Sequence, residues 1–125
     1  MKKLLTNQEI YEYALGLKNT FNNTVIELPV LINYSIQKNL HTLIGVAQTI
    51  DQLKNNIGEK YGVYDSEVNG FKILPENMAQ AQADLEKLME IEEKVEIRTI
   101  KLDDLKDIKL TNQQMAALLF MIEEE

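Results

Sequence analysis

Apolar residues recur at helical spacing along most of the chain, so helices dominate the predicted structure. Thr6 and Glu9 form a capping box that starts a first helix, whose stripe then runs from Ile10 to Leu17. Residues 19–23 are rich in Asn and Thr, which favour turns, and they end this helix. Residues 24–28 are short and β-prone, and Pro29 biases the residue before it toward an extended conformation.

The longest predicted element is a helix over residues 29–61. Its apolar side chains follow alternating steps of four and three, which is typical of a coiled coil. At about 1.5 Å per residue this helix is ~48 Å long, whereas a domain of this size has a radius of gyration near 14 Å. Another helix of this chain or a second chain must therefore cover its overhang. We call its six apolar positions the heptad stripe: Ile36, Leu40, Leu43, Ala47, Ile50 and Ile57.

The C-terminal half predicts a hairpin, two further helices and a strand. Asn69 and Gly70 stand between Val68 and Phe71, which predicts a type I′ turn with positive φ at both central residues. A third helix opens at Pro75 and carries an apolar stripe through residues 78–89. Residues 95–100 alternate and are β-branched, so they predict a strand that pairs with the hairpin or with residues 24–28. Residues 111–114 form a second capping box before a last helix.

Together these elements predict a single α+β domain over residues 1–125 that is mostly helical. The long central helix packs against two or three further helices, and the hairpin and the strand 95–100 form a small antiparallel sheet. The composition agrees with a globular domain, because 45% of the residues are hydrophobic and 26% are charged.

The negative charge is concentrated in the second half of the chain. Residues 1–62 hold six lysines and five acids, a net charge of +1, whereas residues 63–125 hold six lysines, Arg98 and fifteen acids, a net charge of −8. Such an acidic half disfavours nucleic acid as a partner, because phosphate binding needs clustered Lys and Arg. It either binds a basic partner or serves only as a solvated surface.

The candidate partner contacts lie near the predicted junction of the third helix and the strand: Glu92, Glu93, Glu96 and Arg98. Arg98 is expected to share a strand face with Glu96 and to neutralise part of this cluster.

The residue types that carry catalysis or bind metals are scarce. The chain has no Cys and one His, His41, which we interpret as a flank or partner-contact residue rather than a metal ligand. Ser35 and Lys38 match S-x-x-K, but the other motifs of enzymes with that sequence are absent. We therefore expect no cofactor, no metal and no catalytic residue, and a protein that is not an enzyme. Asn39, beside Leu40 of the stripe, is expected either to hydrogen-bond a partner or to be solvated.

The N-terminus and the hydropathy predict a cytoplasmic protein without membrane segments. Polar residues at positions 7–9 interrupt the apolar run that a signal peptide requires. No apolar stretch approaches the ~20 residues that span a bilayer.

Three stretches of the sequence resemble a group of small proteins encoded by bacteriophages and prophages of Gram-positive bacteria. They are LPV at 28–30 leading into IQKNL at 36–40, EEKVEI at 92–97, and IKLT at 108–111 with Leu118, Met121 and Ile122. The resemblance spans most of the chain and rests on packing and capping residues. It implies a phage origin and a helper or interaction role, without a defined activity.

The leading hypothesis is a non-enzymatic, phage-encoded interaction protein. It self-associates through the heptad stripe into a homo-oligomer and acts in phage assembly or host takeover. A second hypothesis is an inhibitor that binds a host or defence protein through its acidic C-terminal half. A third is a small-molecule-binding protein or enzyme with a cleft between the long helix and the sheet.

Overall fold

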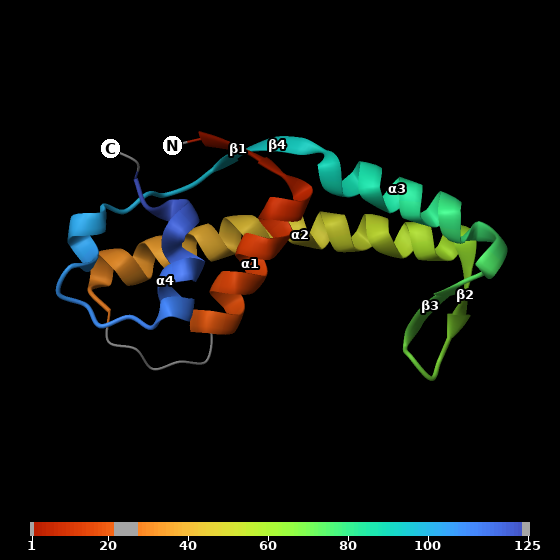
Figure 1. The fold of residues 1–125 in the computed structure, drawn as a ribbon, viewed down its shortest axis with the longest axis horizontal. Coiled ribbons are helices and arrows are strands. Elements are labelled where there is room, and N and C mark those ends of the chain that lie inside the picture. Colours follow the sequence, from red (N-terminus) through yellow and green to blue (C-terminus); the bar gives the residue numbers. More distant parts are fainter. Residues whose placement is uncertain (1, 22–27, 124–125) are drawn as a thin grey trace.

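The computed structural model describes residues 2–21 and 28–123. It confirms an α+β fold that is mostly helical, with a long helix packed against shorter ones (Figure 1). The elements in chain order are β1 (Lys2–Thr6), α1 (Asn7–Phe21), α2 (Val30–Tyr61), β2 (Gly62–Asp65), β3 (Gly70–Ile73), the 3-10 helix η1 (Pro75–Asn77), α3 (Met78–Glu90), β4 (Glu92–Glu96), η2 (Leu102–Leu105), α4 (Asn112–Leu118) and η3 (Leu119–Met121).

The molecule is elongated, and α2 runs along most of its length (Figure 1). We call residues 51–90 the arm: the last third of α2 (residues 51–61), the β2–β3 hairpin, and α3, which lies alongside α2. The remaining described elements form the head, around residues 30–50 of α2. The overhang of the long helix is thus covered, in part, by this chain's own α3 and hairpin. No helix in the described ranges combines the length and apolarity that crossing a membrane requires.

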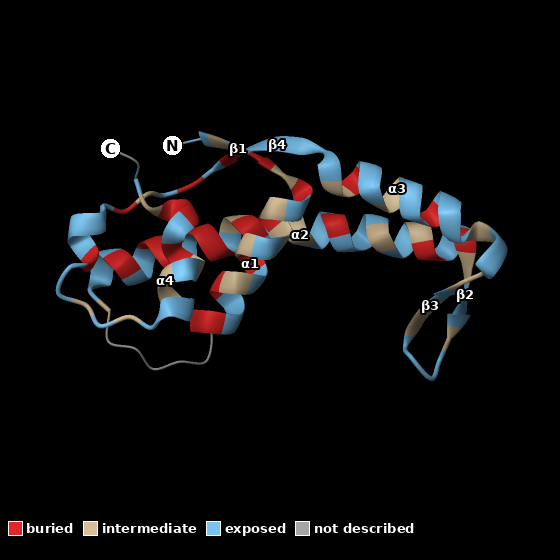
Figure 2. Cartoon of the chain, in the orientation of Figure 1, coloured by how far each residue is buried: buried red, intermediate tan, exposed pale blue. Residues whose placement is uncertain are grey.

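The hydrophobic core lies mainly in the head, where buried residues gather along the first half of α2 (Figure 2). Ile36 and Leu43 of α2 are fully buried there. On the α1 side, the ring of Tyr13 stacks on Phe120 of η3 with centroids 4.5 Å apart. Elements from both ends of the chain therefore pack against each other in the head.

The strand predicted over residues 95–100 is wrong in its bounds and its partner. The observed strand, β4, ends at Glu96, and it pairs antiparallel with β1 rather than with the hairpin. Leu5 of β1 and Val95 of β4 are both buried, so this ribbon covers the core with its inner face. The burial of Leu5 and Val95 favours pairing of β4 with β1, and it outweighs the preference of residues 95–100 for a strand of their own. The other expected partner was a strand over residues 24–28, of which residues 24–27 lie outside the described residues.

The single small sheet is therefore replaced, in the part of the chain described, by two separate two-stranded sheets. The second is the predicted hairpin, β2–β3, but its turn spans residues 66–69 and Gly70 pairs with Asp65. Among the residues that the structure describes, only Asn69 has a positive φ, 51°, so the prediction of a two-residue type I′ turn is wrong. Asn tolerates this conformation, and here its side-chain oxygen accepts a hydrogen bond from the Tyr64 hydroxyl at 3.0 Å.

Both predicted capping boxes are confirmed. The Thr6 hydroxyl accepts from the Glu9 backbone N–H at 3.1 Å, and the Glu9 carboxylate accepts from the Thr6 N–H at 3.0 Å. Thr111 and Gln114 repeat this exchange at 3.1 and 2.8 Å. These caps set where α1 and α4 begin.

Asn39 is buried in the head and binds the backbone of this chain, not a partner or solvent. Its Nδ2 donates to the Arg98 carbonyl at 2.9 Å, and its Oδ1 accepts from the Arg98 N–H at 2.7 Å. One side-chain amide thus serves both backbone groups of a residue outside regular structure. The neighbouring Ile97 and Ile100 are buried on either side. We call this pair of hydrogen bonds the Asn39 clamp.

We predict that Asn39→Ala destabilises the fold by about 2–4 kcal/mol, because it leaves both backbone groups of Arg98 without a partner. The matched control is Asn56→Ala, an exposed position of the same helix, which should be neutral or slightly stabilising. Urea unfolding measures both free energies. Equal effects of the two substitutions would show that the clamp contributes nothing to stability.

Candidate functional site

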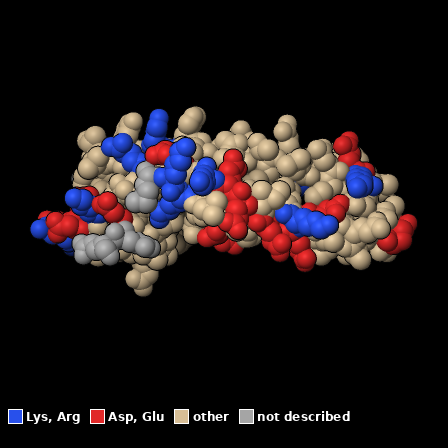
Figure 3. Space-filling view, turned by 90° about the horizontal axis from the view of Figure 1, so that it is seen from above, with Lys and Arg blue, Asp and Glu red and all other residues tan. Residues whose placement is uncertain are grey.

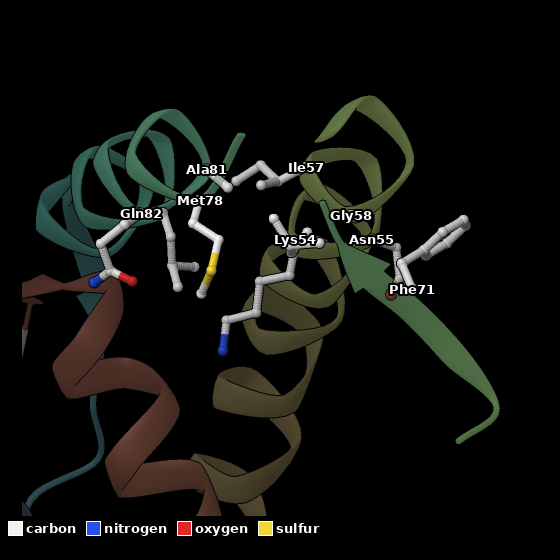
Figure 4. A pocket seen from close by; sticks show the side chains of 10 residues that line it. Lys54, Asn55, Ile57, Gly58, Phe71, Met78, Ala81 and Gln82 are labelled. Carbon is white, nitrogen blue, oxygen red and sulfur yellow. The ribbon is translucent and has the colours of Figure 1, made fainter. Parts of the chain in front are cut away.

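An apolar groove runs along the arm between α2, α3 and β3. It encloses about 340 Å³. In Figure 4, Met78 of α3 points toward Lys54 of α2, Ala81 lies opposite Ile57, and Phe71 lies beside Gly58. Its apolar lining includes Ile57, Phe71, Ile73, Met78 and Leu85. We call this feature the arm groove.

Two glycines at the end of α2 shape the groove. A Cβ on Gly58 would lie 2.9 Å from Cβ of Phe71, and a Cβ on Gly62 would clash with the Lys72 carbonyl. The hairpin therefore packs directly on the helix backbone. This close approach places Phe71 at one wall of the groove, while Met78 at another wall stays largely exposed.

A second buried asparagine fixes the base of the arm to the head. Asn7 Nδ2 donates to the Leu88 carbonyl at 2.8 Å, and the Asn7 backbone N–H donates to the Ile91 carbonyl at 2.8 Å. The end of α3 is thereby held at the start of α1. One of the elements that bound the groove, α3, is therefore anchored to the head at its C-terminal end.

The arm is acidic, and its lysines have neighbours within the fold. Residues 51–90 hold eight acids and four lysines, a net charge of −4. Lys60 lies 4.0 Å from Asp84, and Lys72 lies 3.8 Å from Asp65. These exposed pairs contribute little to stability, but they offset two of the lysine charges locally. The arm as a whole is therefore net negative, whereas the only charged residue that lines the groove itself is Lys54.

Lys54 lies at the end of the groove nearest α1. Its ammonium is 4.1 Å from the centroid of the Tyr11 ring, a cation–π contact. The negative charge of Asp51, with burial and a hydrogen bond to the same carboxylate, raises the pKa of Tyr11. The phenol of Tyr11 thus keeps its proton at neutral pH.

The heptad stripe mostly faces this chain's own core. Ile36, Leu40, Leu43 and Ile50 are buried in the head cluster. Ala47 and Ile57 remain partly exposed, Ala47 beside α1 and Ile57 in the arm groove. A second copy would therefore meet only these two stripe positions on the folded surface, and self-association stays a prediction.

The predicted partner contacts separate into two places. Glu92, Glu93 and Glu96 lie on β4, with Glu93 on the same strand face as Val95. On the face shown in Figure 3, carboxylates gather near the middle with cations on either side. Arg98 lies beyond the strand: its Nε donates to the Ser35 hydroxyl at 3.2 Å, and its guanidinium carbon is 4.9 Å from the Tyr34 ring centroid. The described side-chain contacts of Arg98 are thus with α2, contrary to the expected strand face.

His41 is exposed on α2. Among the residues that the structure describes, no three His, Asp or Glu side chains are close enough together to hold a metal ion.

The third hypothesis expected a cleft between the long helix and the sheet, and the arm groove lies between α2, β3 and α3. Sequence analysis missed the residues that line it. The α3 positions were identified as an apolar stripe, but Met78 and Leu85 were assigned to packing rather than to a surface. The available signal was the pair Gly58 and Gly62, which marks a close backbone approach at the end of a long helix.

Comparisons of the chain with protein-family models, with curated proteins and with solved structures find no match.

We predict that Gly58→Ala is destabilising relative to Gly45→Ala, the same change on the same helix. A Cβ at Gly45 meets nothing within 4 Å, so that variant gains only helix propensity. At Gly58 the methyl group displaces Phe71. The unfolding free energy of Gly58→Ala should therefore be about 1–3 kcal/mol lower than that of Gly45→Ala. Thermal or urea unfolding measures it. Identical stabilities would show that the hairpin does not pack on Gly58 as described.

Proposed function

We propose that this protein is a non-enzymatic interaction protein whose arm binds an apolar segment of another polypeptide chain. The arm groove carries this proposal: it is an apolar channel along two packed helices, and it is open to solvent at Met78. An amphipathic helix laid into such a groove is a common mode of peptide recognition.

A polypeptide fits the groove better than a small polar substrate does. Small-molecule sites combine an apolar lining with a few polar groups aimed at the ligand. Two of the polar side chains that line it already have neighbours, since Lys54 lies over Tyr11 and Gln82 donates to Glu86 at 3.3 Å. This favours an interaction protein over an enzyme or a small-molecule-binding protein.

We further propose that the protein is phage-encoded and acts in phage assembly or host takeover. The three resembling stretches of sequence support this setting. The inhibitor hypothesis, in which the acidic half binds a host or defence protein, is supported by the charge of −4 on the arm and by the carboxylates of Glu92 and Glu93 on β4. Both alternatives require a surface that binds another polypeptide chain. They differ in the identity of that chain.

A photo-crosslinking side chain at Asn55 tests the proposal in the cells that make the protein. Asn55 lines the arm groove, and its neighbour Asn56 is an exposed control on the same helix. We expect cross-links to another polypeptide at position 55, several-fold more than at position 56. Adding Leu85→Glu, which puts a charge into the groove, should abolish them. Equal cross-linking at both positions, or none at position 55, would contradict the proposal.

A further inference from the structure

The charge that lines the arm groove is opposite in sign to the charge of the arm. None of the arm's eight acids lines the groove, and Lys54 does. Lys54 is also partly buried, whereas the other three lysines of the arm are exposed. Lys60 and Lys72 each have a carboxylate within 4.0 Å, but no carboxylate of the described residues lies this close to Lys54. The groove therefore carries one positive charge without an acidic partner.

The Lys54 ammonium is held at the end of the groove nearest α1. It lies 4.1 Å from the centroid of the Tyr11 ring, and Met78 points toward it across the groove (Figure 4). The acid nearest to it in sequence is Asp51, which lines a hollow between α1 and α2 and interacts with the Tyr11 hydroxyl. Partial burial takes hydration from the ammonium group, and a carboxylate from outside the chain would offset that loss.

We propose that the segment bound in the arm groove is an amphipathic helix with one acidic side chain, which pairs with Lys54 at the end of its apolar face. This inference rests on the proposed function and names the chemistry of the bound segment. The charges are complementary at the one point where the groove lining is charged. The net charge of −4 on the arm disfavours further carboxylates on the same segment.

The length of the groove sets the spacing of the bound residues. Met78 and Leu85 both line it and are seven positions apart on α3, so it extends about 10 Å, or about two helical turns. Apolar side chains at positions i and i+4 of the bound helix then pack against Ile57 and Phe71 near the hairpin. Its carboxylate, at position i+7, reaches Lys54.

Three synthetic helical peptides test this arrangement with the full chain. All have leucines at positions i and i+4, and they carry Glu, Gln or Lys at i+7. A compensating residue on the outer face gives the three peptides the same net charge. Fluorescence anisotropy measures their dissociation constants for the wild type, Lys54→Glu, Lys54→Gln and the control Lys87→Glu. Lys87 is an exposed residue of α3 outside the groove lining, and its substitution changes the net charge as much as Lys54→Glu does.

The wild type and the control are expected to bind the Glu peptide about threefold to tenfold more tightly than the Lys peptide. This preference should shrink at high salt, because ions screen the pair. Lys54→Glu should reverse the order of the two peptides. Lys54→Gln, which keeps the size of the side chain without its charge, should lose the preference for Glu.

Equal affinities of the wild type for the three peptides would overturn the inference, and so would a failure of all three to bind. A preference for Glu that persists in Lys54→Glu would also overturn it, because another cation would then be responsible. If cross-links from position 55 to another polypeptide form despite any of these results, the proposed function stands and only the carboxylate at Lys54 is rejected.

Discussion

The fold depends on the hydrogen bonds that Asn39 makes from the middle of the head. Its amide side chain binds the N–H and the carbonyl of Arg98, as a neighbouring strand would, and so holds an irregular segment across α2. Ile97 and Ile100 are thereby fixed in the core. The Ile100 N–H then donates to the Met121 carbonyl at 2.9 Å, which joins the C-terminal helices to the same layer. An apolar residue in place of Asn39 would leave this segment without its register.

Most elements of the chain pack on the part of α2 that lies in the head, and few are left to cover the part that lies in the arm. Residues 30–50 of α2 contact α1, Met121 of η3 and the segment that Asn39 holds, whereas residues 51–61 are covered mainly by α3 and a two-stranded hairpin. Two thin elements do not enclose a helix, so Ile57, Phe71 and Met78 line a groove open to solvent. The proposed function follows from this unequal coverage, because an uncovered apolar surface favours a binding partner.

Local signals in the sequence predicted the helix caps correctly and the hairpin in place though not in turn type, and contacts between distant residues decided the rest. The capping boxes at Thr6 and Thr111 involve residues three apart, so their geometry is contained in the sequence pattern. The heptad stripe identified the buried face of α2, but a stripe has the same appearance whether its own chain or a second copy covers it. The strand β4 was misplaced because its partner, β1, lies about ninety residues away and precedes a helix cap. The residues that line the arm groove were missed for the same reason, because the groove forms only when the hairpin folds back and places Phe71 against Gly58.

Native-state hydrogen exchange of the Arg98 amide tests most directly the claim that a buried clamp closes the head and leaves the arm less protected. Arg98 lies outside regular structure, yet its amide donates to Asn39 at 2.7 Å. The account predicts that this amide exchanges only on global unfolding, together with the amides of Ile36 and Leu43, while the hairpin amides exchange faster. Exchange of the Arg98 amide at the rate of the hairpin would contradict the account.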